Sequence, residues 1–424
     1  MVEGTADNSA AAPASPGAAG ARSKPQKKRS IWWRIHQWSG LQLSLFLAFV
    51  MLTGTLAVFS YELDWLTRPS MWAAPTAYEE RVSWGDVGAA VAEHDSDLQI
   101  VNLYAPLHPA STFDVIVRDG ETLRHVYVHP RTGEVTGEGS WFGFQRFLRN
   151  AHRHLMLPVP IGVTLVSMAA VFLTASLVTS FWVYKKWWRG FTRWPKGRNA
   201  RAFTGDLHRI AGVWSIWFIV LMIVTGFWYL IEQWGGAAPP ASAAQAPAVM
   251  AEASPSPSLP GAPAALDAGI AALKAELPEY RIARVVWPRE PGDDFQVHGW
   301  TGRAILVRPR ANTAWINSDT GALTGVVDPS ALGVHTRIAE AADPLHFGTF
   351  GGYWTKTLWF LFGAALTGLS LTGAAIYALR IAKAERRPTG WRRGLTDAWR
   401  AMGRLRWLSA LLVLTPFALI PVLF

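Results

Sequence analysis

The chain contains no cysteine among its 424 residues. That absence excludes disulfide bridges, covalently attached c-type haem and cysteine-ligated iron–sulfur clusters. The sequence also lacks the G-x-S-x-G nucleophile motif, the H-E-x-x-H zinc motif, the P-loop and the dinucleotide-binding glycine fingerprint. Any cofactor is therefore expected to be bound by histidine, methionine or oxygen ligands, and no flavin or nicotinamide site is indicated.

Apolar residues, by contrast, are abundant and concentrated in a few stretches. Half of the residues are hydrophobic, and the chain contains 23 tryptophans. Four stretches reach the ~20 residues that a membrane-spanning helix needs, near residues 35–60, 158–184, 210–232 and 353–380. A fifth, 407–424, is shorter and contains Pro416 and Pro421. The sequence predicts an α-helical membrane protein with a four-helix core and a fifth helix after it.

The basic residues indicate how these helices are oriented. Of the 40 Lys and Arg residues, 23 lie in three short segments before the first helix, at 185–209 and at 380–406. The much longer segments 61–157 and 232–345 hold eight each. The positive-inside rule places the short segments in the cytoplasm and the long ones outside. The net charge of +10 therefore reflects topology and gives no argument for nucleic-acid binding.

The two long outer segments resemble each other. Each contains an alternating run, Phe113–Val115 or Phe295–Val297, and ends in Thr-Gly-x-(Val/Leu)-Thr-Gly. Alternation between glycine-containing turns is typical of antiparallel strands. Helix-like stretches at 83–94 and 264–277 precede these strands. The sequence thus predicts two small α+β modules and a duplicated unit of helix, module and helix.

These patterns divide the chain into expected regions. The expected order is a disordered cytoplasmic N-terminus (1–30), a first membrane helix (31–60), module 1 (61–150), a second helix (151–185), a cytoplasmic loop (186–205), a third helix (206–232), a Pro/Ala-rich linker (233–263), module 2 (264–343), a fourth helix (344–382), a basic cytoplasmic segment (383–406) and the fifth helix (407–424). The first apolar stretch is too long for the core of a cleaved signal peptide and is expected to be an anchor.

A His-x-x-x-Gly motif opens the first and third membrane helices at repeated spacing. Thr-Gly follows seventeen and eighteen residues after each histidine. The residues are His36, Gly40 and Thr53-Gly54 in the first helix, and His208, Gly212 and Thr225-Gly226 in the third. Eighteen residues of one continuous helix make five turns and rise ~27 Å. The histidine and both glycines would then share one helix face, which suits a flat macrocycle at each membrane depth.

Two further histidines, His152 and His346, precede the second and fourth helices. Because both copies of the unit cross in the same direction, a pseudo-twofold axis along the membrane normal would relate them. The expected pairs are His36 with His208 near the cytoplasmic face and His152 with His346 near the outer face. Each pair suits one b-type haem with two axial histidines. His154 is the fallback for His152.

Simpler interpretations exist for the same residues. A lone histidine at a helix end is usually interfacial, and small-xxx-small spacing usually serves helix packing. Repetition of the whole pattern favours four ligands. The neighbouring arginines Arg34, Arg209, Arg149 and Arg153 fit haem propionates or lipid headgroups equally well. The other six histidines are expected to be solvated or structural, with His335 able to approach the outer face.

These motifs resemble the PepSY-associated transmembrane family, which includes ferric-siderophore reductases of the bacterial inner membrane. The resemblance rests on IHQWSGL (35–41) with LTG (52–54), AHRHLMLP (151–158), DLHRIAGVW (206–214), DPLHFGTFGG (343–352) and the TGEVTG and TGALTG turns of the two modules. It covers residues 30–380 and implies periplasmic PepSY-like modules and two b-type haems on His36, His208, His152 and His346. The second histidine in His152-Arg-His154 departs from the simple pattern.

The resemblance implies electron transfer from a cytoplasmic or membrane donor to a periplasmic acceptor. A ferric siderophore or other ferric chelate would be reduced to release Fe(II), and a quinol, a flavodoxin or a flavin reductase would be the separate donor. Two other classes of function remain open. The modules could serve a non-redox sensor or peptidase-regulating scaffold, or the four histidines could line a metal transporter.

Overall fold

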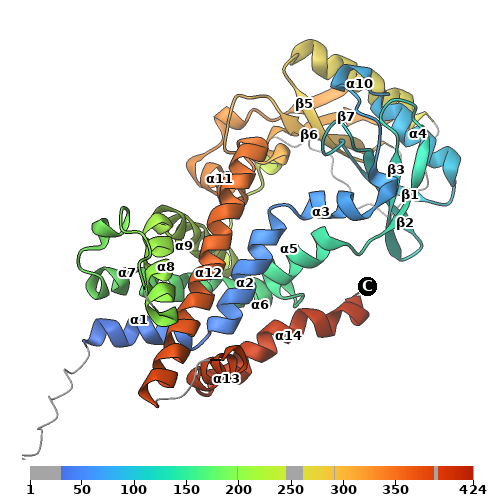
Figure 1. The fold of residues 1–424 in the computed structure, drawn as a ribbon. Coiled ribbons are helices and arrows are strands. Elements are labelled where there is room, and N and C mark those ends of the chain that lie inside the picture. The colour runs from blue at the N-terminus through green and yellow to red at the C-terminus, as the bar shows by residue number, and fades with distance from the viewer. Residues whose placement is uncertain (1–29, 198, 245–260, 291, 386–389, 424) are drawn as a thin grey trace, which may run out of the picture.

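The computed structural model describes residues 30–197, 199–244, 261–290, 292–385 and 390–423. Most of the chain is helical, and an antiparallel sheet lies at one end of the helices (Figure 1). We call these parts the helical domain and the sheet domain. The expected disordered N-terminus and most of the expected Pro/Ala-rich linker lie outside the described residues.

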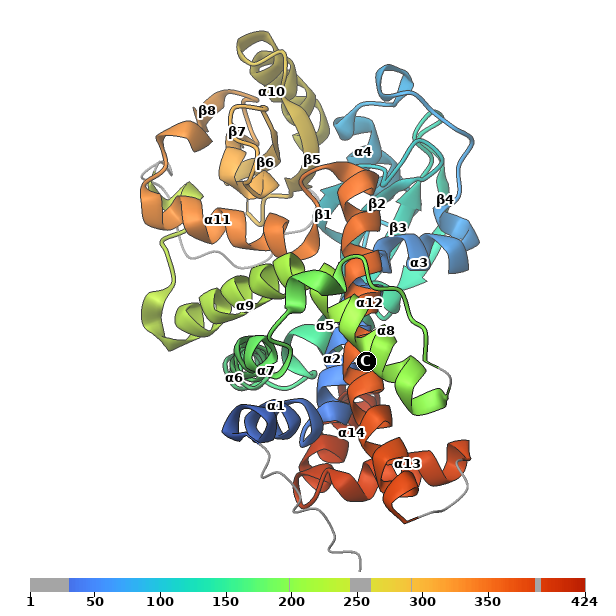
Figure 2. The same ribbon diagram turned by 60° about the vertical axis from the view of Figure 1, so that its left-hand side comes forward.

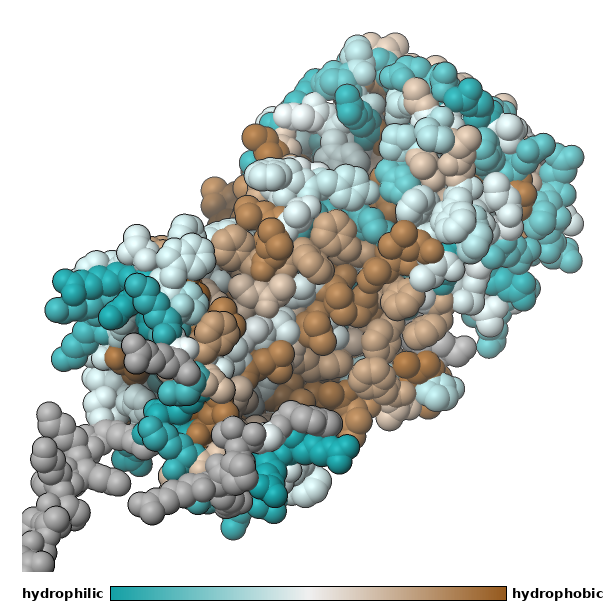
Figure 3. Space-filling model, viewed as in Figure 1, coloured by the Kyte–Doolittle hydropathy of each residue, from teal (hydrophilic) through white to brown (hydrophobic). Residues whose placement is uncertain are grey.

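Within the described residues, four helices are long and apolar enough to cross a membrane. They are Val159–Val183 (α6, Val159–Ser167, with α7, Ala169–Val183), Ile216–Gly236 (α9, Ile216–Ile231, with its short continuation), Gly352–Ala384 (α12) and Leu405–Leu423 (α14). Figure 3 shows apolar side chains gathered over the middle of the helical domain, with hydrophilic surface at both ends. A membrane protein with helices and β modules is thus confirmed.

The first membrane segment is bent, which corrects the expectation of one continuous helix. It consists of α1 (Ile31–Leu41) and α2 (Ser44–Ala57), which meet at 60°. The break lies at Gln42 and Leu43, where Leu43 leaves the helical conformation with φ −113° and ψ 24°. His36 and Gly54 therefore lie on different helices, and the calculated ~27 Å rise along one helix face does not apply.

The third segment is also interrupted. It consists of α8 (Ala200–Trp214) and α9, which are separated at Ser215. His208 and Gly226 therefore do not share one helix either. The other two candidate histidines lie on helices that precede the membrane spans, α5 (Phe144–His154) and α11 (Val334–Phe347).

The two predicted modules form one continuous sheet, which corrects the expectation of two separate ones. Module 1 contributes β1 (Gln99–Tyr104), β2 (Phe113–Asp119), β3 (Thr122–Val128) and β4 (Val135–Ser140). Module 2 contributes β5 (Arg281–Val286), β6 (Asp294–Trp300), β7 (Ala314–Asn317) and β8 (Leu323–Val326). The order is β4-β3-β2-β1-β5-β6-β7-β8, and antiparallel pairing of β1 with β5 joins the halves. This pairing removes two exposed edges, which would otherwise invite aggregation.

Helices cover one face of the sheet. The helices α4 (Trp84–His94) and α10 (Ala262–Glu276) pack there over a common apolar core (Figures 1 and 2). Asp267 on α10 accepts hydrogen bonds from the hydroxyl of Ser83 at 2.6 Å and from Gly85 N–H at 2.8 Å, so it holds the start of α4. The opposite face, which we call the under-surface, is turned toward α3 (Ser60–Thr67) and α5.

Candidate functional site

The outer pair of candidate ligands meets between the two halves of the chain. His152 lies in the last turn of α5 and His346 in the last turn of α11. Their imidazole rings have centroids 6.0 Å apart at an interplanar angle of 36°. When two imidazoles bind the same metal ion from opposite sides at ~2 Å, their ring centroids are about 6 Å apart. The separation therefore fits a shared metal ion.

All four candidate histidines use Nδ1 for a hydrogen bond within their own half of the chain. Nδ1 of His36 lies 3.0 Å from the carbonyl oxygen of Ser176, and Nδ1 of His152 lies 2.9 Å from that of Val50. A carbonyl oxygen only accepts, so these two Nδ1 atoms carry the proton. In the neutral ring Nε2 is then left with its lone pair, the form that binds a metal.

Threonine hydroxyls fix the same tautomer in the second half. Nδ1 of His208 lies 2.9 Å from Oγ1 of Thr372, and Nδ1 of His346 lies 2.8 Å from Oγ1 of Thr225. Each hydroxyl already donates its proton to a carbonyl one turn earlier on its own helix. It therefore accepts from the imidazole, and Nε2 is again the free nitrogen. Metal-binding histidines commonly have their second nitrogen held in this way.

The inner pair is arranged more loosely than the outer pair. His36 on α1 and His208 on α8 are close enough to interact electrostatically, but the described residues show no ring contact between them. His36 also lies 3.2 Å from Oγ1 of Thr179, the counterpart of Thr372 beside His208. The two inner histidines thus have matching neighbours on α7 and α12.

His154, the fallback ligand, points elsewhere. Its Nδ1 lies 2.8 Å from the carbonyl oxygen of Leu157, just beyond the end of its own helix. Leu155 and Met156, which directly follow His154, have φ values of 55° and 57°. This left-handed conformation is costly for non-glycine residues. Both are buried, and the sharp turn that they make separates α5 from the span that starts at Val159. The geometry favours His152.

The candidate glycines have different surroundings. A Cβ atom at Gly54 would lie 2.5 Å from Cε1 of His152, so this glycine makes room for an imidazole ring. At Gly40 a Cβ would meet no atom within 4 Å. Gly212 and Gly226 face Leu369 and Ala170, respectively. Gly54 thus makes room for a candidate ligand side chain, whereas its counterpart Gly226 serves helix packing.

Replacing Gly54 with alanine is expected to displace His152. The added methyl group would overlap the imidazole, and overpacking of this kind typically costs about 1–3 kcal/mol. Thermal unfolding of the purified protein measures the loss. Gly205→Ala on α8 is the matched control, because a Cβ there meets no atom within 4 Å. Equal unfolding temperatures for the two variants would contradict the packing of His152 on Gly54.

The four candidate arginines are not equivalent. Arg34 and Arg153 are exposed, whereas Arg209 donates to Asp206 at 2.7 Å. The Nε of Arg209 is buried without a hydrogen-bond partner. Arg149 donates to the phenol oxygen of Tyr61 at 3.3 Å. Arg209 and Arg149 therefore remain beside the inner and outer pairs, while Arg34 and Arg153 point toward solvent or lipid.

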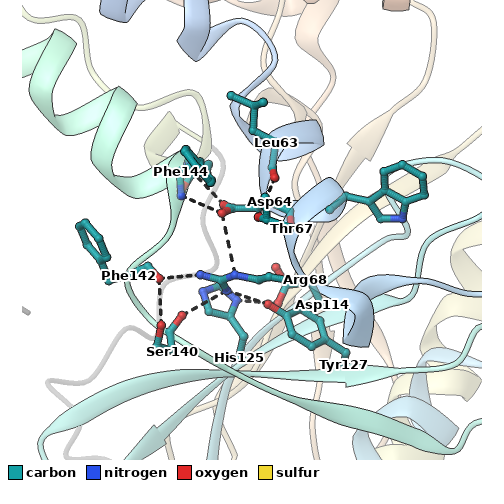
Figure 4. Close-up of polar contacts among 12 residues, drawn as sticks. Leu63, Asp64, Thr67, Arg68, Asp114, His125, Tyr127, Ser140, Phe142 and Phe144 are labelled. Carbon is teal, nitrogen blue, oxygen red and sulfur yellow. Dashed lines mark hydrogen bonds and ion pairs between the residues drawn. The ribbon is translucent and has the colours of Figure 1, made fainter.

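A polar junction fixes the helix that carries His152. Asp64 on α3 accepts the backbone N–H of Phe144 at 2.7 Å and so caps the start of α5 (Figure 4). Next to it, Arg68 donates to the phenol oxygen of Tyr127 at 2.9 Å and to the carbonyl of Phe142 at 2.6 Å. Strand β3 and helix α5 are thereby held together, so the sheet domain positions the first outer histidine.

A second junction fixes the helix that carries His346. Arg308 donates to Glu340 at 2.7 Å and to Asp343 at 3.0 Å, both on α11. Asp343 also accepts the hydroxyl of Tyr229 on α9 at 2.8 Å. The Tyr229 ring meets the His346 ring edge-on, with centroids 5.3 Å apart. A charged network thus links module 2 to the second outer histidine.

The other histidines serve local structure. His335 lies 3.0 Å from the carbonyl oxygen of Gly236 and is not part of the outer pair. Sequence reasoning missed the three threonines beside the imidazoles and the Arg308 network. Thr225 belongs to the repeated Thr-Gly motif, so its position was a signal, although a hydrogen-bonding role was not inferred from it.

Comparison with known proteins agrees with the architecture. Uncharacterized protein PA4219 of Pseudomonas aeruginosa is 32% identical to this chain over 79 residues. The match covers 19% of this chain and 20% of that protein, so the chain aligns with about a fifth of the relative's length. The model of the PepSY-associated TM region matches residues 33–380, which include all four candidate histidines. The chain therefore belongs to the family of proteins with a PepSY-associated transmembrane region.

Proposed function

We propose that this protein binds two b-type haems and carries electrons across a membrane to a ferric chelate. The observation that carries the proposal is the outer pair. His152 and His346 come from opposite halves of the chain, their ring centroids lie 6.0 Å apart, and their Nδ1 atoms are bonded away from each other. Two neutral imidazoles with free Nε2 atoms form an axial ligand set for haem iron.

The surroundings of the histidines fit such a group. Each half holds its imidazoles in a fixed tautomer through a backbone carbonyl or a threonine hydroxyl. Gly40 leaves space beside its helix. The Nε of Arg209 is buried without a hydrogen-bond partner, and a haem propionate would accept a hydrogen bond from it. When bound, each haem would supply a one-electron carrier, because two axial histidines favour electron transfer over oxygen binding.

The proposed orientation follows the distribution of charge. Basic residues gather in the segments at one end of the helical domain, and the sheet domain lies at the other. We infer a bacterial inner membrane with the N-terminus in the cytoplasm and the sheet domain in the periplasm. His36 and His208 would then receive electrons from a quinol, a flavodoxin or a flavin reductase. His152 and His346 would deliver them to a ferric siderophore or similar chelate.

The absorption spectrum of the purified protein tests this proposal. From cells supplied with iron and haem precursor, the protein should be red, with a Soret band that shifts when dithionite is added. Anaerobic addition of a ferric chelate should return the oxidised spectrum, whereas the redox-inert gallium chelate should not. A colourless preparation would favour the scaffold or the transporter. A reduced spectrum that ferric chelates leave unchanged would exclude iron reduction.

A further inference from the structure

The helices that carry the outer histidines have opposite charges at matching positions. Three and six residues before His152, α5 has Arg149 and Arg146. Three and six residues before His346, α11 has Asp343 and Glu340. These spacings place both residues of each pair one and two turns away from the ligand, near its own helix face. The two halves of the chain therefore have similar backbones but inverted charges at this site.

The carboxylates of the second half are neutralised within the protein. Arg308 contacts Glu340 and Asp343, and Arg310 lies 3.4 Å from Glu340. Burial on its own would lower the pKa of Arg308, but the hydrogen bonds that Arg308 donates to Glu340, together with the charge of Asp343, raise it. The Glu340 side chain is only 2% exposed. This side of the site is thus a closed ion-pair network.

The arginines of the first half have no such partner. Among the described residues, neither Arg146 nor Arg149 has a carboxylate oxygen within 4.0 Å. Arg146 lies over the ring of Trp141 at 3.4 Å from its centroid, and its Nε is buried without a hydrogen-bond partner. Burial lowers the pKa of Arg146, and the charge of Arg149 acts in the same direction, whereas Tyr61, Tyr104 and Asp64 raise it. The net direction is that of a cation only partly compensated by its neighbours.

Aromatic contacts connect these guanidinium groups to the outer pair. Arg149 lies 5.4 Å from the ring centroid of Phe347, and that ring lies 5.4 Å from the ring centroid of His346. An anion bound by Arg149 would therefore be separated from the His346 imidazole by the Phe347 ring and the Arg149 side chain.

The under-surface above α5 carries a further arginine. Arg284 on β5 lies over the ring of Tyr104, and Arg146 and Asp114 are within electrostatic range of the same tyrosine. Burial, followed by the charges of Arg284 and Arg310, lowers the pKa of His298 on β6 to about 4. Arg284, whose guanidinium hydrogen-bonds to the neutral amide of Asn102, thus adds a second cation on the sheet side of Arg146.

A nearby cavity is less suitable for an anion. It has a volume of ≈ 660 Å³ and is lined by strands β3 and β4, Trp141 and the end of α14. Its walls contain Glu121 and Glu138, and its arginine, Arg124, is already paired with Asp119 at 2.8 Å. Arg146, which has no carboxylate partner among the described residues, lies on the α5 side of Trp141.

We propose that Arg146 and Arg149 form the docking site for an anionic ferric chelate that presents carboxylate or phenolate oxygens toward the outer histidine pair. Guanidinium groups bind such oxygens through two parallel hydrogen bonds. The inference rests on the proposed ferric reduction and adds the charge class of the substrate. Haem propionates carry the same carboxylate chemistry, so the experiment must separate the two sources.

Calorimetric titration of the purified, haem-loaded protein with Ga(III)–citrate tests the site, because gallium mimics ferric iron without being reduced. Removal of one charge-assisted contact should weaken binding about tenfold. Arg146→Gln and Arg149→Gln should each show that loss, and Arg146→Lys should lose less. Arg124→Gln, a paired arginine on the cavity side, should stay within about twofold of the parent. Haem content and absorption spectrum should be unchanged in all four variants.

The outcomes distinguish this site from the redox proposal. Failure of the parent protein to bind Ga(III)–citrate overturns the docking site, even if ferric chelates reoxidise the haem. Loss of haem from the Arg146 and Arg149 variants with unchanged gallium binding assigns these residues to the propionates and also overturns it. Binding that depends on both arginines, without reoxidation by Fe(III)–citrate, supports the site and rejects ferric reduction. Arg146→Lys keeps the test valid if Arg146→Gln prevents folding.

Discussion

If the protein binds two haems as proposed, replacing His346 with alanine is expected to lower the haem content to about one per chain. The outer haem would lose one axial ligand, and the remaining imidazole of His152 would have no partner from the other half of the chain. The inner pair lies on α1 and α8, with its own hydrogen bonds to α7 and α12, and should keep its haem. The pyridine haemochrome assay, normalised to protein concentration, measures this ratio.

His154→Ala is the matched control for that experiment. His154 lies two residues from His152, but its Nδ1 bonds to Leu157 and its ring is not part of the pair. This variant should keep both haems. Loss of one haem from His154→Ala, with both retained in His152→Ala, would show that the outer ligand was assigned to the wrong histidine. Two haems retained in His346→Ala would refute the pairing across the two halves.

Replacing Arg308 with leucine is expected to destabilise the protein by about 3–5 kcal/mol, the usual cost of removing one partner from a buried ion pair. Asp343 would lose its cation, and Glu340, whose side chain is 2% exposed, would keep only the contact with Arg310 at 3.4 Å. The second half of α11 would lose its contact with Arg308, and His346 lies at the end of that helix. Thermal or denaturant unfolding in a fixed detergent measures the loss.

Arg303→Gln is the control for that loss. Arg303 also pairs with carboxylates in module 2, but the pair with Glu279 is 44% exposed on both sides. Exposed ion pairs contribute about 0–1 kcal/mol, so this variant should unfold close to the parent. Similar unfolding of the two variants would mean that the Arg308 network does not stabilise α11.

The sequence predicted elements whose signals are local. Stretches of ~20 apolar residues identified the membrane helices, because the hydrocarbon core imposes that length. Alternation predicted strands such as Phe113–Asp119, since one face of the sheet packs on α4 and α10. His152 and His346 were singled out because each precedes an apolar stretch in its half of the chain, and the structure brings them within ring contact.

Other features depend on contacts between distant residues and could not be predicted in this way. Alternation specifies which face of a strand is buried but not which strand lies beside it, so the pairing of β1 with β5 was missed. The bend between Leu41 and Ser44 was missed because a long apolar stretch is typical of one continuous helix. The hydrogen bonds from imidazoles to Thr225 and Thr372 required the packing of separate helices.

The seam between β1 and β5 has a consequence for the origin of the duplication. Antiparallel pairing of equivalent strands is self-complementary, as in the interface of a symmetric homodimer. In a single-copy ancestor with this fold, the edge strand equivalent to β1 and β5 would have had no neighbouring strand. Such a chain would also have supplied only one histidine of each pair. Two such subunits, paired through this strand, would have completed the sheet and both histidine pairs. Gene fusion would then have made the association permanent. After fusion, the charged residues beside each histidine could diverge.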